Sequence, residues 1–213
     1  MTAASDVVMP PPIARLPRDK HGRPIPWFVH VDDDGVPDFR VIRVGGIRDA
    51  VMFGWCWVCG QPRGRHAAFV IGPMCAVNRV SAEPPAHLDC AIYSAQACPF
   101  LSTPRMVRRE SRLPEGTAHP AGLMIRRNPG VALVWSSKTW STVAVHGGGE
   151  LFNVGDPTAT RWFAEGRIAT RDEVLASIDS GLPLLREQAA EDGPRAIALL
   201  ERMEATAREL VPK

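Results

Sequence analysis

The sequence predicts an α+β fold with a treble-clef-like zinc module, a small antiparallel β-sheet and C-terminal helices. Three observations lead to this prediction. Four potential metal ligands form two short pairs between residues 56 and 90, turn residues separate short apolar segments over 120–155, and a helical pattern fills the end of the chain. At 213 residues, the chain is long enough for one hydrophobic core.

The composition is that of an ordinary globular chain, with 45% hydrophobic residues, 23% charged residues and a net charge of +2. So small a net charge gives no global basic field that would indicate nucleic acid or a membrane surface. The apolar runs are shorter than the roughly 18–20 residues of a membrane span. The N-terminal residues contain no apolar segment of the secretory kind. We therefore expect a cytoplasmic protein with no membrane partner.

The first quarter of the chain is expected to hold a flexible arm and then a β-hairpin region. Residues 1–25 are rich in proline and mixed in charge, which favours a loose arm that packs only at its end. Within 26–54, Trp27–Val31 and Phe39–Ile42 have the composition of strands. Asp32–Gly35 between them suits a tight turn, and it lacks the spacing of an EF-hand calcium loop.

Five cysteines lie between residues 56 and 98: Cys56, Cys59, Cys75, Cys90 and Cys98. An odd number, in a chain expected to be in a reducing compartment, favours thiolate ligands over disulfides. Residues 55–103 are therefore predicted to be a zinc-binding module.

Two of the cysteines form a knuckle, and a second pair of ligands follows on a helix. Cys56 and Cys59 precede Gly60, and His87 and Cys90 are spaced to share a face of a first helical turn. A β-hairpin through 67–71 is expected between the two pairs. Three thiolates and one imidazole suit tetrahedral, structural Zn²⁺, so Cys56, Cys59, His87 and Cys90 are the predicted ligands.

Cys75 and Cys98 remain outside this set. Cys98 is expected to be a small buried hydrophobic residue at a helix end. Cys75 is either an alternative fourth ligand in place of His87 or a reactive thiol with His66 or His87 as its base. An iron–sulfur cluster held by Cys56, Cys59, Cys90 and one of these two cysteines is another alternative.

The hypotheses of an enzymatic function have weaker support, and no catalytic residue is assigned. An HNH-like nuclease would use His66, with Asn78 as its middle residue, but no acidic residue stands beside His66. A thiol enzyme would use a pocket near Cys75, Asn78, Arg79 and His66. The chain contains neither a phosphate-binding glycine loop nor a hydrolase nucleophile elbow.

A basic link over 104–119 follows the zinc module. Four of its arginines are candidates for contacts to nucleic-acid phosphates: Arg105, Arg108, Arg109 and Arg112. DNA or RNA is therefore the leading partner. Alternatively, the link is a solvated segment that pairs with the acidic C-terminal helices.

The remainder of the chain is predicted to be a β-meander over 120–155 and helices over 156–213. Strand-like segments occupy 122–126, 131–135, 142–145 and 151–154. Asp156–Pro157 is typical of a helix start, and that helix would end near Gly166. A second helix begins at the capping box Thr170–Glu173 and ends or kinks at Gly181 or Pro183. A last helix with one apolar stripe begins after Gly193–Pro194.

Many of these motifs together resemble a family of actinobacterial and phage proteins that has no assigned activity. The resemblance lies in Arg15–Lys20, Pro26–Val29, Pro37–Arg40, Cys56–Gly60, Phe69–Arg79, Glu83–Cys90, Cys98–Leu101, Arg127–Val131 and Ala169–Leu185. It implies one integrated unit and a phage or prophage origin, and it carries over no residue role. Inhibition of a host protein is a further hypothesis in this context, and the oligomeric state is not predicted.

Overall fold

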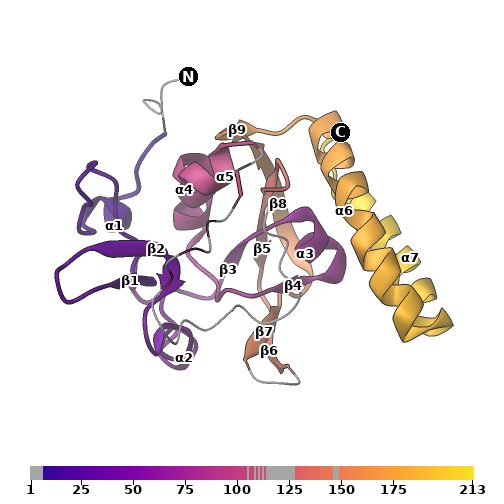
Figure 1. The fold of residues 1–213 in the computed structure, drawn as a ribbon, viewed down its shortest axis with the longest axis horizontal. Coiled ribbons are helices and arrows are strands. Elements are labelled where there is room, and N and C mark those ends of the chain that lie inside the picture. The colour runs from indigo at the N-terminus through magenta and orange to yellow at the C-terminus, as the bar shows by residue number, and fades with distance from the viewer. Residues whose placement is uncertain are drawn as a thin grey trace.

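A four-stranded antiparallel sheet organises the fold of the computed structural model. The structure describes residues 7–104, 106–107, 109, 111, 113, 128–145 and 149–213. The sheet has the order β3–β5–β8–β9, and its strands come from distant parts of the chain: β3 (Ala67–Ile71), β5 (Ala132–Ser137), β8 (Pro157–Ala164) and β9 (Arg167–Ile168). Helices and antiparallel sheets together confirm the predicted α+β class (Figure 1).

Each face of this sheet carries its own hydrophobic cluster, because side chains alternate along the strands. Phe69, Leu133 and Trp162 point into one cluster, which we call the first face. It is covered by α3 (Pro73–Asn78), α6 (Arg171–Asp192) and α7 (Pro194–Glu209). Val134 and Phe163 point into the other cluster, the second face, where α4 (Leu88–Ala97) packs. In Figure 1, α6 and α7 lie together on one side of the sheet and α4 on the other.

A smaller sheet corrects the predicted meander. It has the order β4–β7–β6, with β4 (Val80–Ser81), β6 (Ser141–Ala144) and β7 (Glu150–Asn153). The expected hairpin of β6 and β7 forms, but β5 leaves it and pairs with β3 and β8 instead. Every residue of β5 is buried, so this strand needs a partner on both edges, whereas β6 is exposed throughout. Residues 120–127, where the first meander strand was expected, lie outside the described residues.

The N-terminal hairpin is confirmed. Strands β1 (Val29–Val31) and β2 (Pro37–Ile42) pair antiparallel, and Gly35 adopts a φ of 79° in the turn between them. A short helix that the sequence analysis did not predict, α2 (Gly46–Met52), follows the hairpin.

The prediction of a loose arm over residues 1–25 is wrong for its described part. Residues 7–25 contain a short helix, α1 (Pro11–Ala14), and its Ile13 is 1% exposed. Ile13 packs into the second-face cluster, with Met9 and Leu16 beside it. Apolar side chains spaced along a proline-rich segment are sufficient to attach it to the core.

The helix predicted at Asp156–Pro157 is wrong, since strand β8 begins at Pro157, directly after Asp156. Proline is tolerated at the first position of a strand as well as of a helix. The residues that follow include threonine, tryptophan and phenylalanine, which favour a strand. Pairing along the whole of β5 then fixes the strand.

The two C-terminal helices are confirmed, with one correction. The capping box at Thr170 and Glu173 forms, and α7 begins at Pro194 after Gly193. However, α6 continues through Gly181 and Pro183 to Asp192. Buried residues on both sides of Pro183, such as Ile178 and Ala189, pack into the first-face cluster and compensate for the missing backbone hydrogen bond.

Candidate metal centre

The four predicted ligands converge at one point of the structure. The ligand atoms of Cys56, Cys59, His87 and Cys90 all lie within 4.8 Å of one another. The Nδ1 atom of His87 is 3.4 Å from the Sγ atom of Cys59 and 3.9 Å from that of Cys90. Zinc bond lengths of about 2.3 Å to sulfur and 2.0 Å to nitrogen place tetrahedral ligand atoms about 3.5–3.8 Å apart. The described part of the chain contains no other group of this kind.

A tight turn holds the two knuckle cysteines. The backbone N–H of Gly60 donates to the carbonyl of Cys56 at 2.8 Å, and the N–H of Cys56 donates to the carbonyl of Gln61 at 2.8 Å. Gly60 has a φ of +70°, and a Cβ atom there would lie 2.5 Å from Cδ1 of Trp27. Both the backbone conformation and the contact with Trp27 therefore require glycine at this position.

The other two ligands lie at the start of α4, as predicted. His87 is the N-cap residue of α4, and Cys90 is in its first turn. Ala86 exchanges two backbone hydrogen bonds with Ala68 of β3, at 3.0 and 2.7 Å, which returns the chain to the knuckle just before His87. A β-hairpin was expected between the two pairs of ligands, but only the bridge between Ala68 and Ala86 forms there. The main partner of β3 is instead β5. The arrangement remains treble-clef-like: a knuckle, a strand, a return and a helix start.

The imidazole of His87 is oriented by a second contact. Its Nε2 atom lies 3.0 Å from the carbonyl oxygen of Pro62. Since a carbonyl only accepts, Nε2 carries the proton in this contact and Nδ1 is left as an acceptor facing the sulfurs. Such an outer hydrogen bond is typical of histidines that bind metals.

The three thiols share their protons unequally. Hydrogen bonds from the thiols of Cys59 and Cys90, together with the backbone N–H groups of Cys59 and His87, lower the pKa of Cys56 to about 2. The same hydrogen bonds to Cys56 raise the pKa of Cys59 and of Cys90. One thiolate is therefore stable here by itself, whereas three thiolates this close need a cation among them.

The cluster is closed to solvent on its sulfur side. Cys56, Cys59 and Cys90 are 0%, 4% and 1% exposed, and they belong to the second-face cluster. Trp57, between the two knuckle cysteines, is stacked on Phe28 with ring centroids 4.9 Å apart. Four protein ligands in a buried setting match a structural site rather than a catalytic one, which keeps an open position.

The other two cysteines lie outside the cluster. Cys75 is in α3 and packs against the first-face cluster, away from the four ligands. Burial raises the pKa of both Cys75 and Cys98, which is the reverse of an activated thiol. Cys75 therefore does not replace His87, and the iron–sulfur alternative has only three of the four cysteines it needs. His66, one of the two proposed bases, is exposed and belongs to no metal-ligand group of the described residues.

Most of the predicted phosphate-binding arginines are not described. Arg105, Arg108 and Arg112 lie outside the described residues. Arg109 donates from Nε to the hydroxyl of Ser111 at 3.1 Å, and its carbonyl accepts from Arg40 of β2 at 3.2 Å. The structure thus attaches this part of the link to the N-terminal hairpin.

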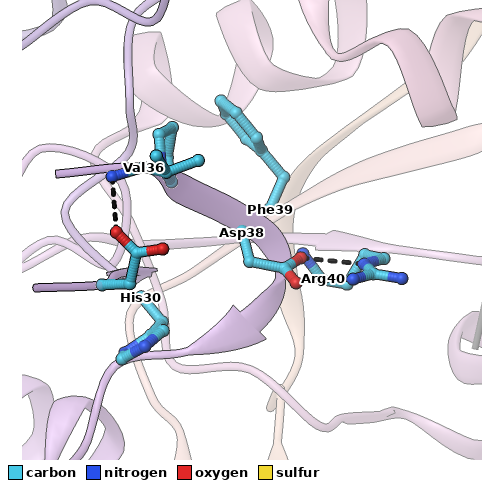
Figure 2. Close-up of a pocket in the computed structure, with 7 residues that line it drawn as sticks. His30, Val36, Asp38, Phe39 and Arg40 are labelled. Carbon is cyan, nitrogen blue, oxygen red and sulfur yellow. Dashed lines mark hydrogen bonds and ion pairs between the residues drawn. The ribbon is translucent and has the colours of Figure 1, made fainter. Parts of the chain in front are cut away.

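A hollow of about 540 Å³ lies on that hairpin. Figure 2 shows Asp38 and Arg40 directed toward each other, with Phe39 pointing away from the pair. The two charged groups form an ion pair at 2.6 Å, and Arg40 also donates to the link. None of the predicted site residues lines this hollow.

Sequence analysis missed a partly exposed group of three aromatic residues and one arginine beside the knuckle, which we call the aromatic surface: Trp27, Arg43, Phe53 and Trp55. The ring of Trp55 meets Trp27 edge-on at 5.7 Å and stacks against Phe53 at 4.9 Å. The guanidinium of Arg43 lies over Trp27, 4.5 Å from the ring centroid. Phe53 is 55% exposed. In the sequence, each of these residues has the character of an ordinary strand or turn residue. Their proximity becomes visible only in the folded structure.

Comparisons with known protein families, with curated proteins and with solved structures give no match to this chain. The resemblance to a phage-associated family therefore stays a prediction. None of the described helices combines the length and the apolar character needed to cross a membrane.

Proposed function

We propose that Cys56, Cys59, His87 and Cys90 bind one Zn²⁺ ion that stabilises the second face of the sheet. The supporting observation is the convergence of four ligand atoms within 4.8 Å, from a knuckle and a helix start far apart in sequence. The histidine orientation and the burial of the sulfurs agree with it. In sites of this type much of the metal-binding free energy is folding free energy.

Elemental analysis and an absorption spectrum of the untagged protein test this proposal. We expect one zinc per chain in the wild type and none in Cys59→Ser, which should also lose stability. Cys98→Ser is the matched control, since it removes a partly buried cysteine outside the cluster. Absence of metal from the wild type would contradict the proposal, as would iron with visible charge-transfer bands.

We further propose that the protein binds single-stranded nucleic acid, with the aromatic surface as its stacking platform. The ring of Trp55 contacts both Trp27 and Phe53, and Phe53 is more than half exposed, so that this group offers an aromatic face to unpaired bases. Arg43 adds a cation on the same surface. Stacking on such side chains contributes about 1–3 kcal/mol per base and tolerates different sequences. In this proposal Arg105, Arg108, Arg109 and Arg112 supply phosphate contacts from the link.

Quenching of tryptophan fluorescence by short single-stranded DNA and RNA oligonucleotides tests this second proposal. We expect Phe53→Ala and Arg43→Gln each to weaken binding by about tenfold. Leu199→Ala, an apolar residue of α7 that is 49% exposed, should leave binding unchanged. Affinity should also fall steeply with salt. Undetectable binding, or equal binding by wild type and Phe53→Ala, would exclude this platform.

The other hypotheses gain no support from the described residues. The nuclease hypothesis requires His66, which belongs to no metal-ligand group of the described residues. The thiol hypothesis requires His66 or His87 as the base for Cys75, and His87 belongs to the ligand group from which Cys75 is absent. Inhibition of a host protein and a phage or prophage origin rest on the resemblance alone.

A further inference from the structure

Arg63 is a buried cation with no carboxylate partner among the described residues. It is 8% exposed, and its Nε atom has no hydrogen-bond acceptor. One terminal nitrogen donates to the carbonyl of His66 at 3.3 Å, and the guanidinium lies 5.4 Å from the ring centroid of Trp140. A buried charge with so few contacts is costly unless an opposite charge lies nearby.

The chain places Arg63 opposite Gly54, two residues before the first metal ligand. Its backbone N–H donates to the carbonyl of Gly54 at 2.8 Å, and Pro62 forms an antiparallel bridge with Trp55. Residues 61–63 therefore run alongside residues 54–56, which end at Cys56. Burial lowers the pKa of Arg63, and the negative charge of Cys56 acts in the opposite direction.

The charge of a loaded cluster explains this placement. Three thiolates and a neutral imidazole around a divalent ion leave one net negative charge in a buried setting. We propose that Arg63 is the buried counter-ion of the zinc–thiolate centre, so that it strengthens zinc binding and makes the bound thiolates less reactive. This inference rests on the proposed zinc function. Arg63 touches no ligand in the described contacts, so it tunes the centre through its charge.

Three variants separate the charge of Arg63 from its packing. Arg63→Met keeps an apolar stem beside Trp140 and removes the charge, whereas Arg63→Lys keeps a charge. Arg63→Gln is a second neutral variant if the methionine variant fails to fold. Arg79→Met is the matched control, because Arg79 also lies over a tryptophan ring, that of Trp135, but pairs with Asp156.

Zinc affinity, measured by competition with a chromophoric chelator, and the alkylation rate of the loaded protein are the two readouts. We expect Arg63→Met or Arg63→Gln to weaken zinc binding by about tenfold and to speed alkylation, as for other outer-sphere partners of metal ligands. Arg63→Lys should restore most of the affinity, and Arg79→Met should behave as the wild type. Thermal unfolding of each loaded variant checks that it is folded.

Two results would contradict the proposal that Arg63 is the counter-ion of the zinc centre. One is a wild-type protein that binds one zinc while the neutral variants bind it equally well. The other is a lysine variant that loses as much affinity as the neutral ones, since charge would then not be the cause. A wild type that binds no zinc would instead reject the proposed function itself.

Discussion

Single residues decide whether the metal ligands can meet. Gly60 is the clearest case, because a positive φ and a ring packed against its Cα exclude any side chain there. Gly64, four residues later, has no such constraint: a Cβ atom there would meet no atom within 4 Å. The two glycines therefore form a natural pair for comparison.

We expect Gly60→Ala to destabilise the protein by about 1–3 kcal/mol and to reduce its zinc content. The added methyl group would collide with Trp27 while the backbone is held in a left-handed conformation. Denaturant unfolding and metal analysis measure the two effects. Gly64→Ala should change the free energy of unfolding by no more than about 0.5 kcal/mol and should leave the zinc content unchanged. If both substitutions had the same small effect, the knuckle would not depend on this turn.

At this scale the sequence predicted the candidate site well. The two pairs of ligands were recognisable because metal ligation imposes short spacings on residues of a few types. Arg63 and the aromatic surface were not predicted, since an arginine or a tryptophan carries no spacing that identifies its partners. Their roles depend on which distant residues the fold brings beside them.

At the scale of elements, the start of α6 combines a capping box with an ion pair. The carboxylate of Glu173 accepts from Arg167 at 2.6 Å and from the backbone N–H of Thr170 at 2.8 Å. The side-chain hydrogen bond from Arg167, followed by that backbone hydrogen bond, lowers the pKa of Glu173 from 4.5 to about 2. The folded state therefore favours the ionised carboxylate.

This shift gives stability a defined dependence on pH. Because the folded pKa is below the unfolded one, the contribution is complete above about pH 4.5 and is lost as pH falls toward 2. We expect Glu173→Gln to be less stable than the wild type at neutral pH and to lose less stability between pH 4.5 and 2.5. Glu187→Gln, at an exposed position of the same helix, should keep the wild-type pH profile. Parallel profiles for the wild type and Glu173→Gln would contradict this assignment.

Elements with strong local signals were predicted correctly, and those that depend on long-range pairing were not. The capping box, the Gly–Pro start of α7 and the Asp–Gly turn of the hairpin are all local features. By contrast, Asp156–Pro157 suits the start of a helix or of a strand, and only the pairing of β8 with β5 decides between them. The predicted meander was wrong for the same reason, since strands that are neighbours in sequence belong to different sheets.

At the scale of the whole molecule, the two faces of the sheet depend on different interactions. The second face is built around the cysteines of the proposed zinc site, together with residues such as Ala68 and Phe163. The first face is built from aliphatic and aromatic side chains of α3, α6 and α7 and contains none of the four ligands. The indole N–H of Trp162 on the sheet also donates to the carbonyl of Leu210 at 2.9 Å, which fixes the end of the chain to this face.

We therefore expect removal of the metal to loosen one face more than the other. Hydrogen exchange of the chelated protein should accelerate most in the knuckle and α4, and least in α6 and α7. Mass spectrometry of loaded and chelated samples measures this difference by segment. Uniform acceleration would mean that the two clusters unfold as one unit. Reloading with zinc should restore protection if the effect comes from the metal.

The central position of β5 also sets an order of events during synthesis. All four ligands, ending with Cys90, precede β5, whose first residue is Ala132. At about 5–20 residues per second, a ribosome makes the intervening chain in about 2–8 seconds. During that interval the residues of the knuckle and of α4 have been synthesised, whereas β3 lacks its main partner. If the proposed zinc site fills at this stage, it precedes the sheet and is a template on which the later strands assemble.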